Sequence, residues 1–192
     1  LGNGPIGRDR AGGGGKDRRV GKSRGGNTVN AVHRWYIRGG AYVLNNALAG
    51  RGDAMTAYDR RLARQFIAAF DQVPPLTEPL VLYRGIGWGS YVNQRGQYLS
   101  ASDNISIALL FTDHDLIVEP SGRPRAVPSG EVLILNVQPG VRVLHIGGVQ
   151  HEWVIDASAR LTEVYRTTND TPRDRTTRIW VTVTPGDTNP TA

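Results

Sequence analysis

The hydrophobic period of this chain changes once, near Pro79, and that change constrains the fold more than any other feature. Before Pro79, apolar residues recur at helical spacing, as in the run Tyr58, Leu62 and Phe66. After Pro79, apolar and polar residues alternate, which is typical of strands with one buried face. Helices first and strands afterwards predict an α+β domain rather than an alternating parallel fold.

Glycine, proline and polar capping residues predict where the elements begin and end. Helices are expected from residue 28 to Gly39-Gly40, over 41–49, from an Asp53 cap to Pro74-Pro75, and over 104–112. Strands are expected over 80–86, 97–101, 131–138, 141–146, 150–156, 160–167 and 177–184. Residues 113–130 contain three prolines and two glycines, which predicts a long loop suited to a closing lid. The expected architecture is N-terminal helices packed on a two-sheet, mostly antiparallel β core.

Residues 1–26 differ in composition from the rest of the chain. They hold ten glycines and seven basic residues against two acidic ones, which predicts a flexible linker or tail. The remaining residues hold 16 basic and 15 acidic side chains, so most of the net charge of +6 lies in this tail. Composition favours a solvated tether over an RNA-binding Arg/Gly segment. One domain is expected over 27–185, followed by a short tail over 186–192.

Composition and spacing argue against several classes of protein. The absence of cysteine excludes disulfides, thiolate nucleophiles and cysteine-based zinc sites, and the four histidines lack metal-ligand spacing. No run approaches the roughly 18 apolar residues of a membrane span. Glycines 85, 87 and 89 do not open a predicted helix, unlike those of a Rossmann fold. Because the chain begins at Leu1, we expect a piece of a longer polypeptide with an upstream domain.

Three separated segments place polar residues on predicted strands: Tyr83-Arg84-Gly85, Ser100-Ala101-Ser102 and Gln150-His151-Glu152. Taken singly, they have structural explanations as a paired charge, a helix cap and a solvated glutamate. In this order they resemble the mono-ADP-ribosyltransferases of the cholera-like branch, whose pattern is arginine, Ser-x-Ser and Gln/Glu-x-Glu. The segment around Asn45 also resembles a helix of the clostridial exoenzymes with an Asn-x-x-Leu-Arg pattern. The resemblance extends over residues 41–166 and includes phage-type ADP-ribosyltransferase domains.

The resemblance implies that Glu152 and Gln150 are the catalytic residues. In this chemistry the nicotinamide–ribose bond of NAD+ breaks, and a carboxylate such as Glu152 stabilises the positive charge that develops on the ribose. On a strand, Gln150 and Glu152 share one face and are expected to project into a cleft, with His151 as a packing or wall residue on the other face. NAD+ would be a co-substrate, and no metal is expected.

The resemblance also assigns the NAD+-binding residues. Arg84 would hold phosphate oxygens through charge-assisted hydrogen bonds. Gly85 has no side chain, so its backbone can approach the nicotinamide amide. Ser100 and Ser102 would position the ribose and Glu152, and Asn45 would contact NAD+ from its helix.

Gln150 indicates the class of acceptor, because an amide hydrogen-bonds but cannot neutralise a guanidinium. We therefore expect a non-arginine acceptor, either a protein side chain such as Asn or Gln or a nucleic-acid base, with a protein favoured. Ala49 stands where the exoenzymes have arginine, and Arg51, Arg123 and Arg125 are candidates to replace it.

By analogy with the family, we expect a toxin, a secreted effector or a phage-delivered domain that acts in the cytoplasm of a target cell. Two alternatives remain open at this stage. One is a nucleic-acid-binding or assembly module with a catalytically idle domain, and the other is an NAD glycohydrolase with water as the acceptor.

Overall fold

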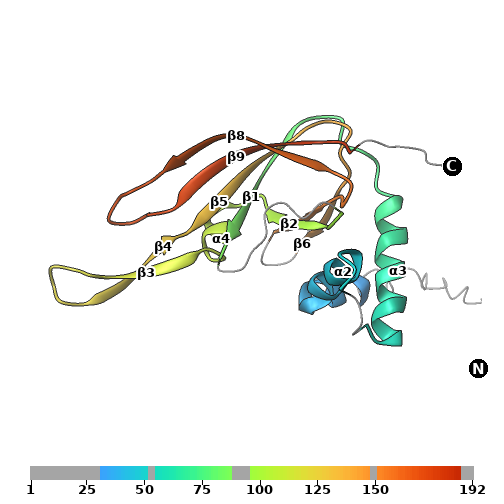
Figure 1. Cartoon of the computed structure of the whole chain (residues 1–192), viewed down its shortest axis with the longest axis horizontal. Helices are drawn as coiled ribbons and strands as arrows, with labels where there is room; N and C mark the ends of the chain where they lie inside the picture. The colour runs from blue at the N-terminus through green and yellow to red at the C-terminus, as the bar shows by residue number, and fades with distance from the viewer. Residues whose placement is uncertain (1–30, 52–54, 88–95, 148–150, 187–192) are drawn as a thin grey trace, which may run out of the picture.

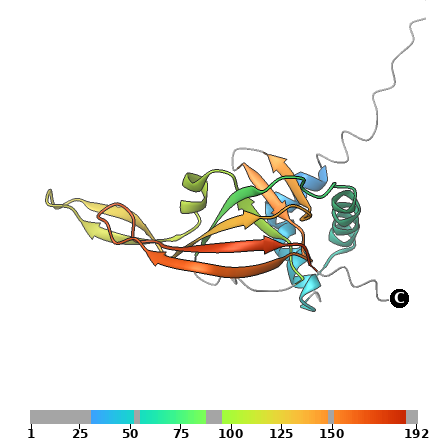
Figure 2. The ribbon, with the colours of Figure 1, turned by 90° about the horizontal axis from the view of Figure 1, so that it is seen from above.

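The computed structural model describes residues 31–51, 55–87, 96–147 and 151–186. The helices before residue 72 lie at one end of an elongated molecule, a hairpin projects from the other end, and a twisted sheet with one short helix beside it connects them (Figures 1 and 2). The α+β class expected from the sequence is confirmed. No helix in these ranges is both long and apolar enough to cross a membrane. The expected tail over 1–26 lies outside the described residues, as does that over 186–192 apart from its first residue.

A kinked helical turn, η1 (Tyr36–Gly40), leads directly into helix α2 (Ala41–Leu48). The kink falls at Gly39, whose φ of 111° favours glycine over any residue with a side chain. A Cβ atom at Gly40 would lie 2.5 Å from the ring of Trp35, so the second glycine lets the indole pack against the bend. The predicted interruption at Gly39-Gly40 is therefore confirmed.

Helix α3 (Ala57–Asp71) begins with a capping box. The Thr56 hydroxyl accepts a hydrogen bond from the backbone N–H of Asp59, and the Asp59 carboxylate accepts one from the backbone N–H of Thr56. Thr56 is thus the cap, and the prediction of Asp53 was wrong because this reciprocal pair lies three residues further along. Asp53 itself lies outside the described residues.

Seven strands form one mixed sheet in the order β6-β7-β2-β1-β5-β9-β8. All neighbouring strands are antiparallel except β5 and β9. Within the described residues, β1 and β2 are joined by a single residue pair, Tyr83 with Ser102, so the sheet divides into parts of three and four strands. This division gives the core the two-part arrangement expected from the sequence. The bounds are β1 (Leu80–Ile86), β2 (Leu99–Ser102), β5 (Glu131–Val137), β6 (Val143–Gly147), β7 (Glu152–Ile155), β8 (Arg160–Thr168) and β9 (Thr177–Thr184).

The buried apolar side chains form two clusters. One fills the space between the two parts of the sheet and includes Leu82, Leu133 and Ile155. The other attaches the helices to Tyr98, directly before β2, and to Val154 of β7, and in it the rings of Tyr36 and Phe66 stack with centroids 4.4 Å apart. The second cluster therefore fixes the helical end of the molecule beside the split in the sheet.

Residues 113–130 form an antiparallel hairpin, β3 (Asp113–Val118) and β4 (Pro124–Ser129), and the predicted loop is wrong. Proline argues against a strand, because it lacks the backbone N–H that donates a hydrogen bond to a neighbouring strand. Pro124 and Pro128 are four residues apart, so both nitrogens point to the same edge of β4, away from β3. At that edge the backbone N–H of Arg175 donates to the carbonyl of Pro128, which ties the hairpin to the β8–β9 connection.

Candidate active site

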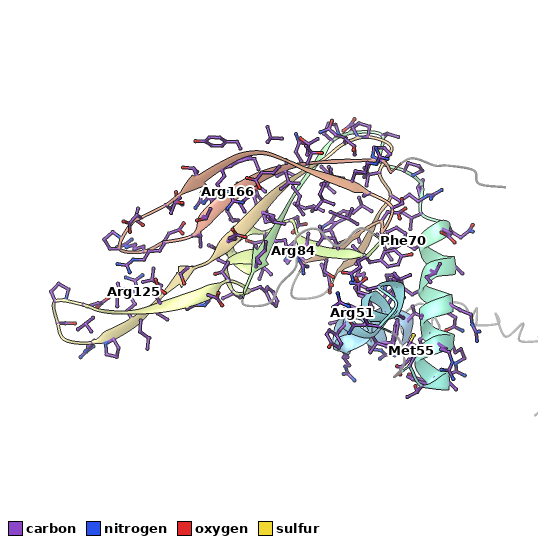
Figure 3. All side chains as sticks on the ribbon, viewed as in Figure 1. Arg51, Met55, Phe70, Arg84, Arg125 and Arg166 are labelled. Atoms are coloured by element: carbon purple, nitrogen blue, oxygen red, sulfur yellow. The ribbon has the colours of Figure 1, made fainter. Side chains whose placement is uncertain are left out.

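Three strands that are distant in sequence meet at the split in the sheet, because β7, β2 and β1 are neighbours. They bring Arg84, Ser100 and Glu152 to one pocket of about 240 Å³. Helix α4 (Ile105–Leu109) and the turn that follows it form another wall of this pocket. The remaining lining residues are Tyr83, Gly85, Gly87, Ala101, Ser102, Ile107, Ala108 and Phe111. Figure 3 shows Arg84 in the middle of the sheet, between the helices and the hairpin.

Hydrogen bonds connect the three polar side chains through Ser100. The guanidinium of Arg84 donates to the backbone carbonyl of Ser100. The hydroxyl of Ser100 is hydrogen-bonded to the carboxylate of Glu152. The residues that the sequence pattern singled out in three segments therefore form one connected group.

Burial and charge act against each other in this group. Burial raises the pKa of Glu152, whereas the Ser100 hydrogen bond and the positive charge of Arg84 lower it, and burial prevails. Burial also lowers the pKa of Arg84, but a guanidinium stays protonated at any physiological pH. A fixed cation and a nearby carboxylate can bind a ligand that carries an anionic group and develops positive charge elsewhere.

Ser102 lies on the same side of β2 as Ser100, as strand alternation requires, and it lines the pocket. Its hydroxyl accepts a hydrogen bond from the backbone N–H of Asn104 at 3.1 Å. The Asn104 side chain in turn caps α4 by accepting a hydrogen bond from the backbone N–H of Ser106. Ser102 therefore links the pocket to the beginning of α4.

Gly85 lies where α4 rests on β1. A Cβ atom at this position would be 1.9 Å from the carbonyl oxygen of Ala108, so only glycine permits this contact. The resemblance predicted a glycine for the approach of nicotinamide to the backbone. The packing of α4 is a second requirement for glycine, and it follows from the tertiary structure alone.

Asn45 holds α2 against the beginning of β2. Its side-chain amide donates to the carbonyl of Tyr98 and its side-chain oxygen accepts from the Tyr98 N–H, both at 2.9 Å. Asn45 is not among the described residues that line the pocket. Its contact with NAD+ stays a prediction. In the structure, Asn45 binds the main chain of Tyr98 and so holds α2 in place.

Gln150 lies outside the described residues, whereas its neighbour His151 is described and exposed. The prediction that His151 packs inward was wrong, because β7 begins at Glu152 and the alternation does not extend to His151. Its Nδ1 lies 3.2 Å from the carboxylate of Asp103, which also accepts from the Trp153 indole at 3.2 Å. Over the ranges that the structure describes, no group of three or more His, Cys, Asp or Glu side chains could hold a metal ion.

The three arginines considered as replacements at Ala49 lie in two places. Arg123 is exposed in the turn between β3 and β4, where its carbonyl accepts a hydrogen bond from the backbone N–H of Glu119. Arg125 lies on the projecting hairpin away from Arg84 (Figure 3), and its guanidinium is 3.6 Å from the carboxylate of Glu119. Arg51 is exposed just beyond α2, at the helical end (Figure 3). Arg51 is therefore better placed than Arg125 to serve a ligand near the helices.

One residue of the site was missed by the sequence analysis. Tyr36 lies within the helix expected from residue 28 to Gly39-Gly40 and was given no role at the site, yet its hydroxyl lies 3.2 Å from the Ser100 hydroxyl. Its side chain is fully buried. Helical spacing indicated the burial of Tyr36 but carried no signal for a polar partner 64 residues away.

The fold is that of bacterial ADP-ribosyltransferase toxins, which confirms the sequence resemblance at the level of the fold. Exoenzyme S from Pseudomonas aeruginosa, solved with carba-NAD and human 14-3-3 protein beta, aligns at 16% identity over 85% of this chain and 78% of its own, with a TM-score of 0.57. The toxin Plx2a from Paenibacillus larvae aligns at 14% identity over 81% of this chain and 85% of its own, with a TM-score of 0.55.

The Clostridium limosum C3 exoenzyme aligns at 15% identity over 81% of this chain and 84% of its own, with a TM-score of 0.52. No protein-family model and no curated protein sequence matches the chain. The relationship to these toxins is therefore visible in the fold and in the three short segments, and not in overall sequence identity.

Proposed function

We propose that this protein transfers ADP-ribose from NAD+ to a macromolecular acceptor and releases nicotinamide. The observation that supports this most strongly is the convergence of Arg84, Ser100 and Glu152 at one pocket from three adjacent strands. The fold adds support, because exoenzyme S has the same fold and was solved with carba-NAD bound.

Each of the three residues has a role that its environment suits. Glu152 stabilises the positive charge that develops on the ribose as the bond to nicotinamide breaks and nicotinamide leaves with the bonding electron pair. Ser100 holds the Glu152 carboxylate through their hydrogen bond. Arg84 binds phosphate oxygens, because its guanidinium lines the pocket and carries donors in a fixed fork, one of which donates to the Ser100 carbonyl. The acceptor then bonds to the ribose carbon and loses its proton.

The size of the pocket suits one half of a dinucleotide. Pockets for drug-sized ligands measure roughly 300–1,000 Å³. At about 240 Å³, this pocket accommodates a ring with its sugar, and the rest of NAD+ would extend along the open side of the split. Ser102 and Gly85 line the same space and would contact that half of the ligand.

The surface that runs from the pocket onto the projecting hairpin supports a protein rather than a nucleic acid as the acceptor. Leu110, Phe111, Leu116 and Val118 are exposed, and Phe111 also lines the pocket. Residues 110–129 contain three acidic and two basic side chains, a balance that does not attract a polyanion. Together with the sequence argument from Gln150, this favours transfer to a non-arginine side chain such as Asn or Gln.

By analogy with the toxins that share the fold, we place this domain in a secreted or delivered protein that acts inside a target cell. The two alternatives predict different products. A glycohydrolase would release nicotinamide with water as the acceptor, and a nucleic-acid-binding module would leave NAD+ intact.

The proposal is tested by incubating the full chain with a cell lysate and NAD+ labelled in its adenylate half. We expect a labelled product that protease destroys and nuclease does not. Glu152→Gln should reduce labelling about 100-fold or more, as expected for the loss of a group that stabilises transition-state charge. Glu163→Gln is the matched control, because Glu163 is an exposed glutamate on β8 paired with Arg166, and it should label like the wild type.

Each other outcome contradicts a part of the proposal. Nicotinamide release at the same rate with and without lysate, and without labelling, would identify a glycohydrolase. Intact NAD+ together with salt-dependent RNA binding would identify a nucleic-acid-binding module. Full labelling by Glu152→Gln would reject the assignment of Glu152.

A further inference from the structure

Tyr36 completes a chain of hydroxyl groups that ends at Glu152. Its phenol oxygen lies 3.2 Å from the Ser100 hydroxyl oxygen, and Ser100 is hydrogen-bonded to the Glu152 carboxylate. The Tyr36 ring is fully buried and stacks on Phe66 with an angle of 4° between the ring planes. The helical end of the molecule thus reaches the catalytic carboxylate through a single residue of β2.

The chemistry of the three groups sets the direction of the hydrogen bonds. An ionised carboxylate only accepts, so the single proton of Ser100 points to Glu152. The Ser100 oxygen can then accept from Tyr36, whose phenol must be the donor. Burial raises the pKa of Tyr36 and outweighs the lowering effect of the Ser100 hydrogen bond. The charge of Glu152 adds a smaller increase in this pKa that exceeds the opposing effect of Arg84, so the phenol keeps its proton at physiological pH.

We propose that Tyr36 is a positioning residue that acts through Ser100 to orient and stabilise the charged carboxylate of Glu152. This inference rests on the proposed function, because it concerns how the catalytic carboxylate is held. Among the residues that the structure describes, the groups that face this carboxylate or its hydrogen-bonding partner are Ser100 from β2, Arg84 from β1 and Tyr36 from η1. Tyr36 is not among the described residues that line the pocket, so it acts on Glu152 and not on NAD+ directly.

The variant Tyr36→Phe tests the inference, because it removes the hydroxyl and keeps the ring that stacks on Phe66. We expect kcat for NAD+ cleavage to fall about fivefold, the equivalent of one neutral hydrogen bond, with KM for NAD+ changed by less than twofold. The acid limb of the pH–rate profile should move to higher pH, because a less stabilised carboxylate is protonated more readily.

Tyr98→Phe is the matched control. Tyr98 is a buried tyrosine of the same aromatic cluster, with its ring 5.3 Å from that of Phe66, and the charges that raise its pKa are Asp156 and Asp71 rather than Glu152. Removing this hydroxyl should leave kcat and the pH profile of the wild type unchanged. Equal effects of Tyr36→Phe and Tyr98→Phe would overturn the inference, since they would indicate a general packing effect.

A double variant gives a second measurement. If the Tyr36 hydroxyl acts through Ser100, adding Tyr36→Phe to Ser100→Ala should change kcat by less than twofold. If the two substitutions instead reduced kcat by the product of their separate factors, the inference would be overturned. It would also be overturned if Tyr36→Phe changed KM for NAD+ and left the pH–rate profile unchanged. A wild-type protein that does not cleave NAD+ would instead overturn the proposed function, so the two failures are distinguishable.

Discussion

The contact between β1 and α4 leads to a quantitative prediction for Gly85→Ala. The added methyl carbon would lie 1.9 Å from the carbonyl oxygen of Ala108 and 3.0 Å from the backbone carbon of Phe111. Real Cβ atoms essentially never approach other heavy atoms within 3.0 Å, so the Ala108 carbonyl must move by more than 1 Å. The obstacle is the backbone of α4, which cannot rotate away as a flexible side chain would.

The expected cost follows from overpacking. Extra methyl groups in a packed interior cost about 1–3 kcal/mol, and a backbone contact places Gly85→Ala at about 2–3 kcal/mol. For a domain of this size each kcal/mol lowers Tm by roughly 2–4 °C, which gives a decrease of about 4–12 °C. Because Ile107, Ala108 and Phe111 line the pocket, the displacement of α4 should also weaken NAD+ binding.

Thermal unfolding followed by circular dichroism measures this effect, with Gly87→Ala as the matched control. A Cβ atom at Gly87 would lie 3.1 Å from the carbonyl oxygen of Phe111, a tight contact that small shifts relieve, so its cost should stay below about 1 kcal/mol. If the Tm of the Gly85→Ala variant lay within about 1 °C of the Tm of the Gly87→Ala variant, the packing argument would be refuted. A normal Tm with weakened NAD+ binding would show that Gly85 serves only the ligand.

Two further predictions concern single side chains. Arg84→Lys should weaken NAD+ binding about 10- to 100-fold by calorimetry, because a charged hydrogen-bonding fork is worth about 1.5–3 kcal/mol; an unchanged Kd would reject the phosphate role. For Asp174, burial alone raises the pKa, but hydrogen bonds from Thr176, Asn169 and Arg178 outweigh it and hold the pKa at about 2. A carboxyl with a folded pKa below its unfolded value stabilises the fold above the unfolded pKa near 3.8 and loses that contribution as the pH falls towards 2. Asp174→Asn should therefore lower the unfolding free energy by about 1–2 kcal/mol at pH 7, after allowance for solvent screening. The difference from the wild type should shrink in melts below about pH 4 and vanish as the pH falls through about 2.

The strands show how far local patterns can be trusted. Strands Leu80–Ile86 and Thr177–Thr184 were predicted to the residue. In Thr177–Thr184, buried and half-buried positions alternate from Ile179 onwards, and such alternation is a local property that the sequence displays. The hairpin of β3 and β4 was missed because its prolines oppose a strand unless they face an unpaired edge, and the edge is known only once the partner strand is placed. The same holds for His151, whose orientation depends on where β7 begins.

The candidate site likewise combines features that are visible in the sequence with features that only the fold creates. The order of Arg84, Ser100 and Glu152 in short segments was visible in the sequence, because each motif spans only a few residues. Their meeting at one pocket depends on β1, β2 and β7 being neighbours, and β7 lies some 50 residues after β2 in the chain.

The sequence by itself determined the class of fold, the approximate strands and the three polar segments, since each of these depends on neighbours within one element. Only the tertiary structure decided that the hydroxyls of Tyr36 and Ser100 form a hydrogen bond, that the backbone of α4 packs directly on Gly85, and that Asn45 binds the main chain of Tyr98. These contacts join residues 23 to 64 positions apart in the sequence. They form only when different elements pack together, and such packing produces no periodic pattern of residues from which it could be predicted.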